Sequence, residues 1–111
     1  MDFISNAQIA IHVTDLARAR EFYRDKLGFR LIDETAEQLV FETGRFRLYV
    51  NKDTVVLPFI PALEVRDYKA AREYLLNGGC EIVRDLPESK ALYFRDPLGQ
   101  LLDIKEANFF K

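Results

Sequence analysis

The sequence predicts an α+β protein built from two tandem βαβββ units, one covering about residues 6–51 and the other about residues 56–106. Three observations support this prediction. Two stretches of the chain repeat the same order of residue types. In each stretch a two-residue alternation of apolar and polar side chains changes to a helical spacing. Three short apolar runs separated by turn residues then follow each helix. We expect residues 1–111 to form one domain containing both units.

The repeat is visible in "IHVTDLARAREFY", which begins at Ile11, and "LEVRDYKAAREYL", which begins at Leu63. The two stretches align at a shift of 52 residues, from Ile11 to Leu63. Their continuations, "LVFETGRFRL" and "LYFRDPLGQLLD", also correspond when the second copy has two extra turn residues, Pro97 and Leu98. A repeat of about fifty residues is typical of a supersecondary module.

The first unit begins with a strand, because Ile9, Ile11 and Val13 alternate with smaller or polar residues. Thr14 and Asp15 are favourable helix caps, and Gly28 is a favourable helix stop. Between them one helical face carries apolar side chains: Leu16, Ala19, Phe22, Tyr23 and Leu27. Three strands are predicted after this helix, over Phe29–Ile32, Gln38–Phe41 and Arg45–Val50.

The second unit repeats this order after a linker at Lys52–Thr54. Pro58 and Pro61 predict that its first strand lies at a sheet edge or is interrupted. Its helix is predicted to begin at Asp67 and to end at Gly78 and Gly79. The three following strands are predicted over Glu81–Val83, Ala91–Phe94 and Gln100–Ile104.

Composition excludes several classes of protein. The hydrophobic fraction is 49%, the charged fraction is 31% and the net charge is −2, without blocks of one sign, so we expect no nucleic-acid or membrane partner. Met1–Ala10 lacks the pattern of a secretion signal, and we expect a cytoplasmic protein. The single cysteine, Cys80, cannot form an internal disulfide. A chain this short buries a limited share of its surface, which favours dimerisation.

Two stretches resemble a known family. "HVTDLARAREFYRDKLGF" (12–29) and "FRDPLGQLLDI" (94–104) are similar to the first strand and helix and to the last turn and strand of the vicinal oxygen chelate superfamily. This superfamily includes glyoxalase I, bleomycin-resistance proteins and extradiol dioxygenases. The resemblance implies that the two units form an incomplete barrel, and that the protein is a homodimer.

The resemblance also implies where a metal would bind. Metal-dependent members place one ligand on the first strand and one on the last strand of each unit. These positions correspond to Gln8, Leu48, Ile60 and Asp103, with Leu48 assigned through the repeat. Moving the strand alignment by one residue offers Arg47 or Tyr49 instead. Two aliphatic side chains cannot coordinate a cation, so we expect no metal and no other cofactor.

Strand parity predicts which side chains share the face of the resembling barrel. On the first strand of the two units these are Gln8 and His12, and Ile60 and Glu64; on the final strand they are Leu101 and Asp103. His12 is a candidate catalytic base if Glu64 or Asp103 orients it, although a binding or structural role is the alternative. Phe46 and Tyr93 are among the strand aromatics that could line an apolar pocket. The predicted ligand-binding residues are Gln8, His12, Phe46, Leu48, Ile60, Glu64, Tyr93, Leu101 and Asp103.

Two further stretches carry weaker predictions. The charges of the first helix, Arg18, Arg20, Arg24 and Lys26 with Glu21 and Asp25, indicate a solvated helix face. The C-terminal "NFFK" (108–111) could close over a partner subunit or fray.

Three functions remain open from the sequence. We favour a metal-independent binding protein similar to bleomycin-resistance proteins, which would hold a small aromatic or amphipathic molecule in a homodimer. The second is a glyoxalase-type or dioxygenase-type metalloenzyme that holds its metal with Gln8, His12, Glu64 and Asp103. The third is a non-catalytic structural dimer.

Overall fold

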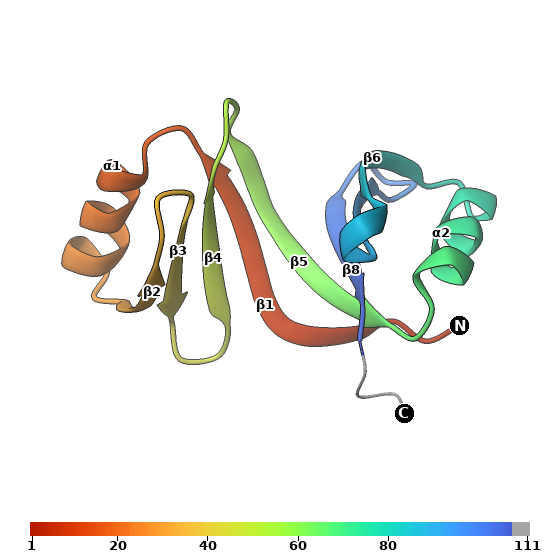
Figure 1. Cartoon of the computed structure of the whole chain (residues 1–111), viewed down its shortest axis with the longest axis horizontal. Helices are drawn as coiled ribbons and strands as arrows, with labels where there is room; N and C mark the ends of the chain where they lie inside the picture. Colours follow the sequence, from red (N-terminus) through yellow and green to blue (C-terminus); the bar gives the residue numbers. More distant parts are fainter. Residues whose placement is uncertain (108–111) are drawn as a thin grey trace. The chain divides into compact units, whose positions relative to one another are not determined.

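The structure is a computed structural model that describes residues 1–107 (Figure 1). The predicted role of "NFFK" therefore lies outside the described residues. Two βαβββ units are present, as predicted. The first contains β1 (Ile4–Val13), α1 (Leu16–Arg20) continued by the π-helix η1 (Glu21–Lys26), β2 (Arg30–Glu34), β3 (Gln38–Glu42) and β4 (Arg47–Lys52). The second contains β5 (Leu57–Val65), α2 (Tyr68–Asn77), β6 (Glu81–Leu86), the 3-10 turn η2 (Pro87–Ser89), β7 (Ala91–Arg95) and β8 (Leu101–Glu106).

Contacts between residues group the chain into two compact bodies. We call Ala7–Ile60 the first unit, and Met1–Asn6 together with Pro61–Lys111 the second unit. The strand order is β2-β3-β4-β1 in the first unit and β6-β7-β8-β5 in the second. In both, the first strand pairs in parallel with the last, while the other pairs are antiparallel. The α+β class and the repeated topology are therefore confirmed.

The helices begin and end where the sequence predicted. The carboxylates of Asp15 and Asp67 each accept a hydrogen bond from the backbone N–H three residues later, at 3.1 Å in both cases. Gly28 and Gly79 follow the two helices with φ of 76° and 89°. Glycine adopts this left-handed conformation without a steric penalty, so each helix can turn back toward its sheet.

The two helices differ by one residue. Asp15 aligns with Asp67 at a shift of 52 residues, whereas Gly28 aligns with Gly79 at a shift of 51. The first unit therefore has one additional residue between its helix cap and its helix stop. The π-helix η1 accommodates it, because a π turn contains more residues than an α turn, and α2 is α-helical throughout.

Each helix covers one face of its sheet with an apolar cluster. Figure 1 shows α1 beside β3 and β4, and α2 beside β6 and β8. The cluster of the first unit consists of Ile11, Ala19, Leu39, Phe41, Leu48 and Val50, and that of the second of Val65, Tyr68, Ala71, Leu75, Leu92, Phe94 and Ile104. We call the opposite side of each sheet its helix-free face.

Equivalent ion pairs attach each helix to the outer strand of its sheet. Arg20 pairs with Glu34 in the first unit, and Arg72 Nε donates to Asp85 Oδ2 at 2.8 Å in the second. Asp85 also accepts a hydrogen bond from the hydroxyl of Tyr68, whose side chain is buried. Burial and this bond raise the pKa of Tyr68, with burial the larger cause. Arg20 and Arg72 thus occupy equivalent positions in the two copies and have the same role, which is to pair with a carboxylate on the outer strand.

Two backbone features depart from a simple strand. Ala7 has a φ of 59°, a left-handed conformation unusual for a residue with a side chain, and it stands where β1 passes from the second unit into the first. β5 runs from Leu57 to Val65 without a break, so of the two outcomes predicted for Pro58 and Pro61, a sheet edge or an interruption, the interruption is wrong. Both prolines precede Ala62–Val65, the residues of β5 that pair with β8, so the ladder between β5 and β8 requires no backbone N–H from them.

Among residues 1–107, no helix has the length and apolar character needed to cross a lipid bilayer.

Candidate functional site

The helix-free face of the first unit carries three rows of side chains across its strands. Residues directly opposite each other in neighbouring strands share a face, so the register defines each row. The rows are Gln8, Arg47 and Glu42; Ala10, Tyr49 and Val40; and His12, Asn51 and Gln38.

Polar side chains on this face are paired with one another. Gln38 Nε2 donates to Asn51 Oδ1 at 2.7 Å, and Arg47 Nε donates to Glu42 Oε2 at 3.3 Å. Hydrogen bonding to Tyr49, together with that to Glu42, raises the pKa of the Arg47 guanidinium. The polar groups of the first unit thus have partners within the unit itself.

His12 is buried, with 6% of its surface exposed, and its partner is Asp53. Nδ1 of His12 lies 2.9 Å from Oδ2 of Asp53. Asp53 is held in place because its N–H donates to Val13 O at 2.8 Å and its Oδ1 accepts from Thr54 N at 2.6 Å. An imidazole with a fixed carboxylate partner can bind or transfer a proton at its other ring nitrogen. The structure therefore assigns the carboxylate beside His12 to the linker, in place of the Glu64 or Asp103 expected from sequence.

The helix-free face of the second unit has the same rows but different chemistry. Its central row is Ala62, Asp103, Tyr93 and Arg84, taken from β5, β8, β7 and β6. The neighbouring row is Glu64, Lys105 and Ala91. Asp103, which sequence placed on this face, lies at its centre.

Asp103 differs from the polar groups of the first unit. Its side chain is half-buried at the centre of this face. Burial raises the pKa of Asp103 to about 7, and the charge of Lys105 opposes this only weakly.

The register corrects one predicted position. Ala10 pairs with Tyr49, and its equivalent Ala62 pairs with Asp103, so Tyr49 occupies the position that corresponds to Asp103. The sequence alignment had assigned Leu48 there and was wrong by one residue. Leu48 is fully buried in the apolar cluster beneath α1. A shift of one residue moves a side chain to the other face of a sheet, so Leu48 cannot line the helix-free face.

The other predicted residues lie in several environments. Gln8 and Glu64 lie on the helix-free face of their own units, as parity predicts. Ile60 and Leu101 are buried and belong to neither apolar cluster. Phe46 packs against the cluster beneath α1, while Tyr93 lies on the helix-free face beside Asp103. Their role as ligand-binding residues stays a prediction.

Two residues of these faces were missed or passed over by sequence reasoning. Asp53 was assigned to a linker, and Tyr49 was considered only as an alternative alignment. The parallel pairing of β1 with β4 ends at Val13 and Lys52, which brings the next residue, Asp53, beside β1. The position of Asp53 beside β1 can therefore be inferred only when the register of β1 and β4 is known.

The donor atoms at the four family positions do not fit a divalent cation. With the corrected register these positions hold Gln8, Tyr49, Ile60 and Asp103. Ile60 has no lone pair, tyrosine is a rare ligand, and the raised pKa keeps the carboxyl of Asp103 partly protonated at neutral pH. Within the described part of the chain, no group of three or more His, Cys, Asp or Glu side chains is arranged to hold a metal.

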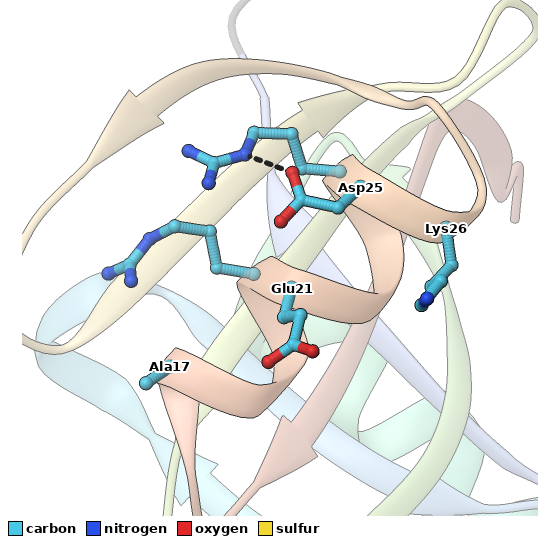
Figure 2. A pocket seen from close by; sticks show the side chains of 6 residues that line it. Ala17, Glu21, Asp25 and Lys26 are labelled. Atoms are coloured by element: carbon cyan, nitrogen blue, oxygen red, sulfur yellow. Dashed lines mark hydrogen bonds and ion pairs between the residues drawn. The ribbon is translucent and has the colours of Figure 1, made fainter.

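A hollow of about 430 Å³ lies on the outer surface of the first helix (Figure 2). Its charged lining residues are mostly neutralised, because Arg24 Nε donates to Asp25 Oδ1 at 2.8 Å and Arg20 pairs with Glu34. Figure 2 shows Glu21 and Lys26 at the same helix surface. Asp25 and Lys26 are exposed, which agrees with the solvated face predicted from the sequence.

Sequence and structure comparisons agree with this architecture. Residues 8–44 match the family described as bleomycin resistance protein-like N-terminal. No curated protein sequence gives a significant match. A variant of homoprotocatechuate 2,3-dioxygenase from Brevibacterium fuscum is similar over 96% of this chain and 33% of its own, with 27% identity and a TM-score of 0.68.

Two further structures from the same organism give the same result. An extradiol ring-cleaving dioxygenase has 26% identity over 96% of this chain and 33% of its own, with a TM-score of 0.69. A homoprotocatechuate 2,3-dioxygenase in complex with 3,4-dihydroxyphenylacetate has 27% identity over 96% of this chain and 37% of its own, with a TM-score of 0.67. The chain thus spans about a third of the length of these enzymes. The repeated βαβββ topology, the family match and these neighbours together show that the chain belongs to the vicinal oxygen chelate superfamily.

Proposed function

We propose that this protein binds a small organic molecule on the helix-free faces of its sheets, without a metal ion. The family match points to bleomycin-resistance-like proteins, and the structural neighbours point to enzymes whose names describe work on aromatic diols. Both groups handle small molecules. The proposed ligand is aromatic or amphipathic, because a tyrosine stands in the central row of each unit: Tyr49 between two apolar residues, and Tyr93 between Asp103 and Arg84.

The observation that carries this proposal is the position of Asp103 between Tyr93 and Ala62, at the centre of the helix-free face of the second unit. The carboxyl of Asp103 can accept a hydrogen bond from a bound molecule and so fix its orientation. Tyr93 and Ala62 flank Asp103 in the same row, and they would supply apolar contact and space. A ligand site of this kind has a mostly apolar wall and a few polar groups that fix orientation.

A second candidate function is proton-transfer catalysis by His12. The observation in its favour is the fixed contact of 2.9 Å between His12 Nδ1 and Asp53 Oδ2. A carboxylate at this position accepts from Nδ1 and fixes the tautomer and orientation of the imidazole. Under this alternative, His12→Gln would abolish turnover while ligand binding remained.

Homodimerisation and a cytoplasmic location belong to the proposal as well. Each unit exposes large apolar side chains, among them Val56 and Phe59 in the first unit and Leu98 in the second. A small chain gains buried surface by association. A homodimer of this chain would supply that surface.

The test combines native mass spectrometry with thermal unfolding. Protein purified without chelator should carry no stoichiometric metal, and its spectrum should report subunit number and any retained molecule. A library of antibiotics, aromatic acids and amines is then screened by thermal shift. A ligand present at about one hundred times its Kd stabilises the folded state by about 2.7 kcal/mol.

Matched variants separate this site from other surfaces. Tyr93→Leu should weaken any ligand that stabilises the wild-type protein, because it removes the ring from the central row. Glu73→Gln, on the exposed surface of α2, should not change the ligand-induced shift. A stoichiometric divalent ion whose loss abolishes binding would refute the metal-independent proposal.

A further inference from the structure

We propose that the outer surface of the first helix is a second binding site, which takes a small organic anion. The apolar group of this ligand lies against Phe22, and its carboxylate or phosphate lies between Arg18 and Lys26. The site belongs to the first unit and to the side of the sheet that the helix covers. It is therefore separate from the helix-free faces, and this inference does not rest on the binding function proposed for them.

A hollow of about 170 Å³ opens on this helix surface, and its lining residues are Arg18, Glu21, Phe22 and Lys26. Arg18, Phe22 and Lys26 follow one another at intervals of four residues, and side chains at this spacing are neighbours on a helix surface. The aromatic ring thus stands between two cations. The larger hollow shown in Figure 2 adjoins this one, because Glu21 and Lys26 line both.

Phe22 is more exposed than the sequence predicted. It was expected on the apolar face of the helix, yet 51% of its surface is exposed. Its equivalent at a shift of 52 residues, Tyr74, has the ring of Phe3 beside it, with the two ring centroids 6.1 Å apart. Within residues 1–107 the one ring beside Phe22 is that of its neighbour Tyr23, edge to face at 5.3 Å. Phe22 therefore retains aromatic surface that a ligand can cover.

The charges beside Phe22 favour an anion. In the described part of the chain, neither Arg18 nor Lys26 makes an ion pair or a hydrogen bond through its side chain, whereas Arg20 and Arg24 are paired as described above. One carboxylate, that of Glu21, lines the hollow with these two cations. The hollow therefore has an excess of positive charge, and charge-assisted hydrogen bonds to a carboxylate or phosphate are among the strongest that Arg and Lys form.

The fold does not require these two cations. At a shift of 52 residues Arg18 corresponds to Ala70. Lys26 corresponds to Gly78 at that shift, or to Asn77 at the shift of 51 that aligns the helix stops. The second helix forms with no cation at either position. Helix formation thus gives no reason for Arg18 and Lys26, whereas the binding of an anion does.

The larger hollow supplies an independent sign that an acceptor is missing. Arg20 lines this hollow, and its Nε is buried without a hydrogen-bond partner in residues 1–107. The equivalent Arg72 donates from Nε to Asp85 at 2.8 Å. Buried donors are rarely left unpaired. An anion bound in these adjoining hollows would bring acceptor oxygens to a helix surface that has donors to spare.

The test uses four probes: phenyl phosphate, phenylacetate, inorganic phosphate and benzyl alcohol. Their affinities for the full chain are measured by titration of amide NMR signals at millimolar probe concentrations and constant ionic strength. The two aromatic anions should bind on the order of tenfold more tightly than inorganic phosphate and benzyl alcohol, because only they offer ring and charge together. The signals that move should include those of Arg18, Phe22 and Lys26. Either order of the two aromatic anions supports the proposal and identifies the preferred oxyanion.

Matched variants separate the ring from the charge, and all of them change exposed residues. Arg18→Gln or Lys26→Gln should weaken phenyl phosphate about tenfold and leave benzyl alcohol unchanged. Phe22→Leu should reduce the affinity for phenyl phosphate to that for inorganic phosphate. Lys69→Gln removes an exposed cation from α2 and should change neither affinity, so it is the control for net charge. The ranking of probes by the wild-type protein requires no variant.

The inference fails if benzyl alcohol binds as tightly as the aromatic anions, or if the signals that move lie outside residues 18–26. Absence of binding by both aromatic anions also overturns it. An equal loss of affinity in Lys69→Gln and Lys26→Gln would show that only the net charge matters, and would overturn it as well. None of these results bears on the function proposed for the helix-free faces, which is tested by Tyr93→Leu.

Discussion

Nδ1 of His12 lies 2.9 Å from Oδ2 of Asp53, and both side chains are almost fully covered, with 8% and 13% of their surfaces exposed. This contact joins the end of the first strand to the segment that leads to the second unit. It also places an imidazole with a fixed carboxylate partner on the helix-free face. Its contribution to stability can be measured separately from any catalytic role.

Asp53→Ala should lower the free energy of unfolding by about 1–3 kcal/mol, because it leaves the buried His12 nitrogen without its acceptor. Asp53→Asn should cost less, since its amide oxygen still accepts a hydrogen bond from His12. The measurement is urea unfolding followed by circular dichroism. Asp25→Ala, on the exposed helix surface, is the control and should have little effect. An equal loss in both alanine variants would show that the His12–Asp53 contact is not stabilising.

Asp103 should make stability depend on pH. Its pKa is raised by burial from 3.8 to about 7 in the folded protein, so the folded state holds the proton more tightly than the unfolded state. The stabilisation of the folded state by this tighter proton binding is fully present below about pH 4, and it is lost as the pH rises toward 7.

Asp103→Asn removes this dependence and should therefore become more stable than the wild type as the pH rises. We expect an advantage on the order of 1–3 kcal/mol at pH values above 7, and near equality below about pH 4. Urea unfolding at a series of pH values measures the difference. Parallel stability curves across that range would show that the carboxyl is not desolvated.

The ion pairs between helix and strand should contribute unequally in the two units. Asp85→Ala leaves the buried hydroxyl of Tyr68 without an acceptor, which costs about 1–3 kcal/mol. Glu34→Ala removes the equivalent carboxylate from the first unit, where Leu16 stands in the position of Tyr68 and no hydroxyl is left unpaired. Thermal unfolding should therefore show a larger loss for Asp85→Ala. In the Tyr68→Phe background this excess should disappear, and its persistence would contradict the explanation.

The backbone at Ala7 provides a fourth test. A left-handed φ of 59° costs an L-residue roughly 1 kcal/mol, and glycine avoids this cost. Ala7→Gly should leave stability unchanged or raise it by up to about 1 kcal/mol, as measured by urea unfolding. Ala10 lies in the same strand but is buried. Ala10→Gly should destabilise the protein, because it removes a packed methyl group and because glycine gives the unfolded chain more conformational entropy to lose on folding. Similar losses in both variants would show that Ala7 is not strained.

The fold could be predicted from the sequence because its signals are local and occur twice. Asp15 and Asp67 cap the helices, Gly28 and Gly79 end them, and the alternation around Ile11 and Leu63 marks the strands. Each of these signals is a property of a few neighbouring residues. Because the second unit repeats the same caps, stops and alternation, the two units support the same assignment of helices and strands.

The site was harder to predict because it depends on register. The turn before the last strand is longer in the second copy; the sequence alignment allowed two extra residues there, whereas the register leaves room for one, and this assigned Leu48 in place of Tyr49. This shift of one residue assigned a side chain from the helix-covered face of the sheet to the helix-free face. The partner of His12 was missed for a related reason, since Asp53 is adjacent to β1 only through the parallel pairing with β4. The raised pKa of Asp103 depends on its surroundings in three dimensions and has no signal in the sequence.

The extra residue within the first helix has a consequence for how the two halves of the protein could diverge. Because η1 takes up that residue as a wider turn, the strands that follow it keep the pairing of their counterparts in the second half. The difference in length is therefore confined to the helix and does not alter the sheet that follows it. Duplicated halves of this kind can change in length inside a helix while their sheets preserve the ancestral plan.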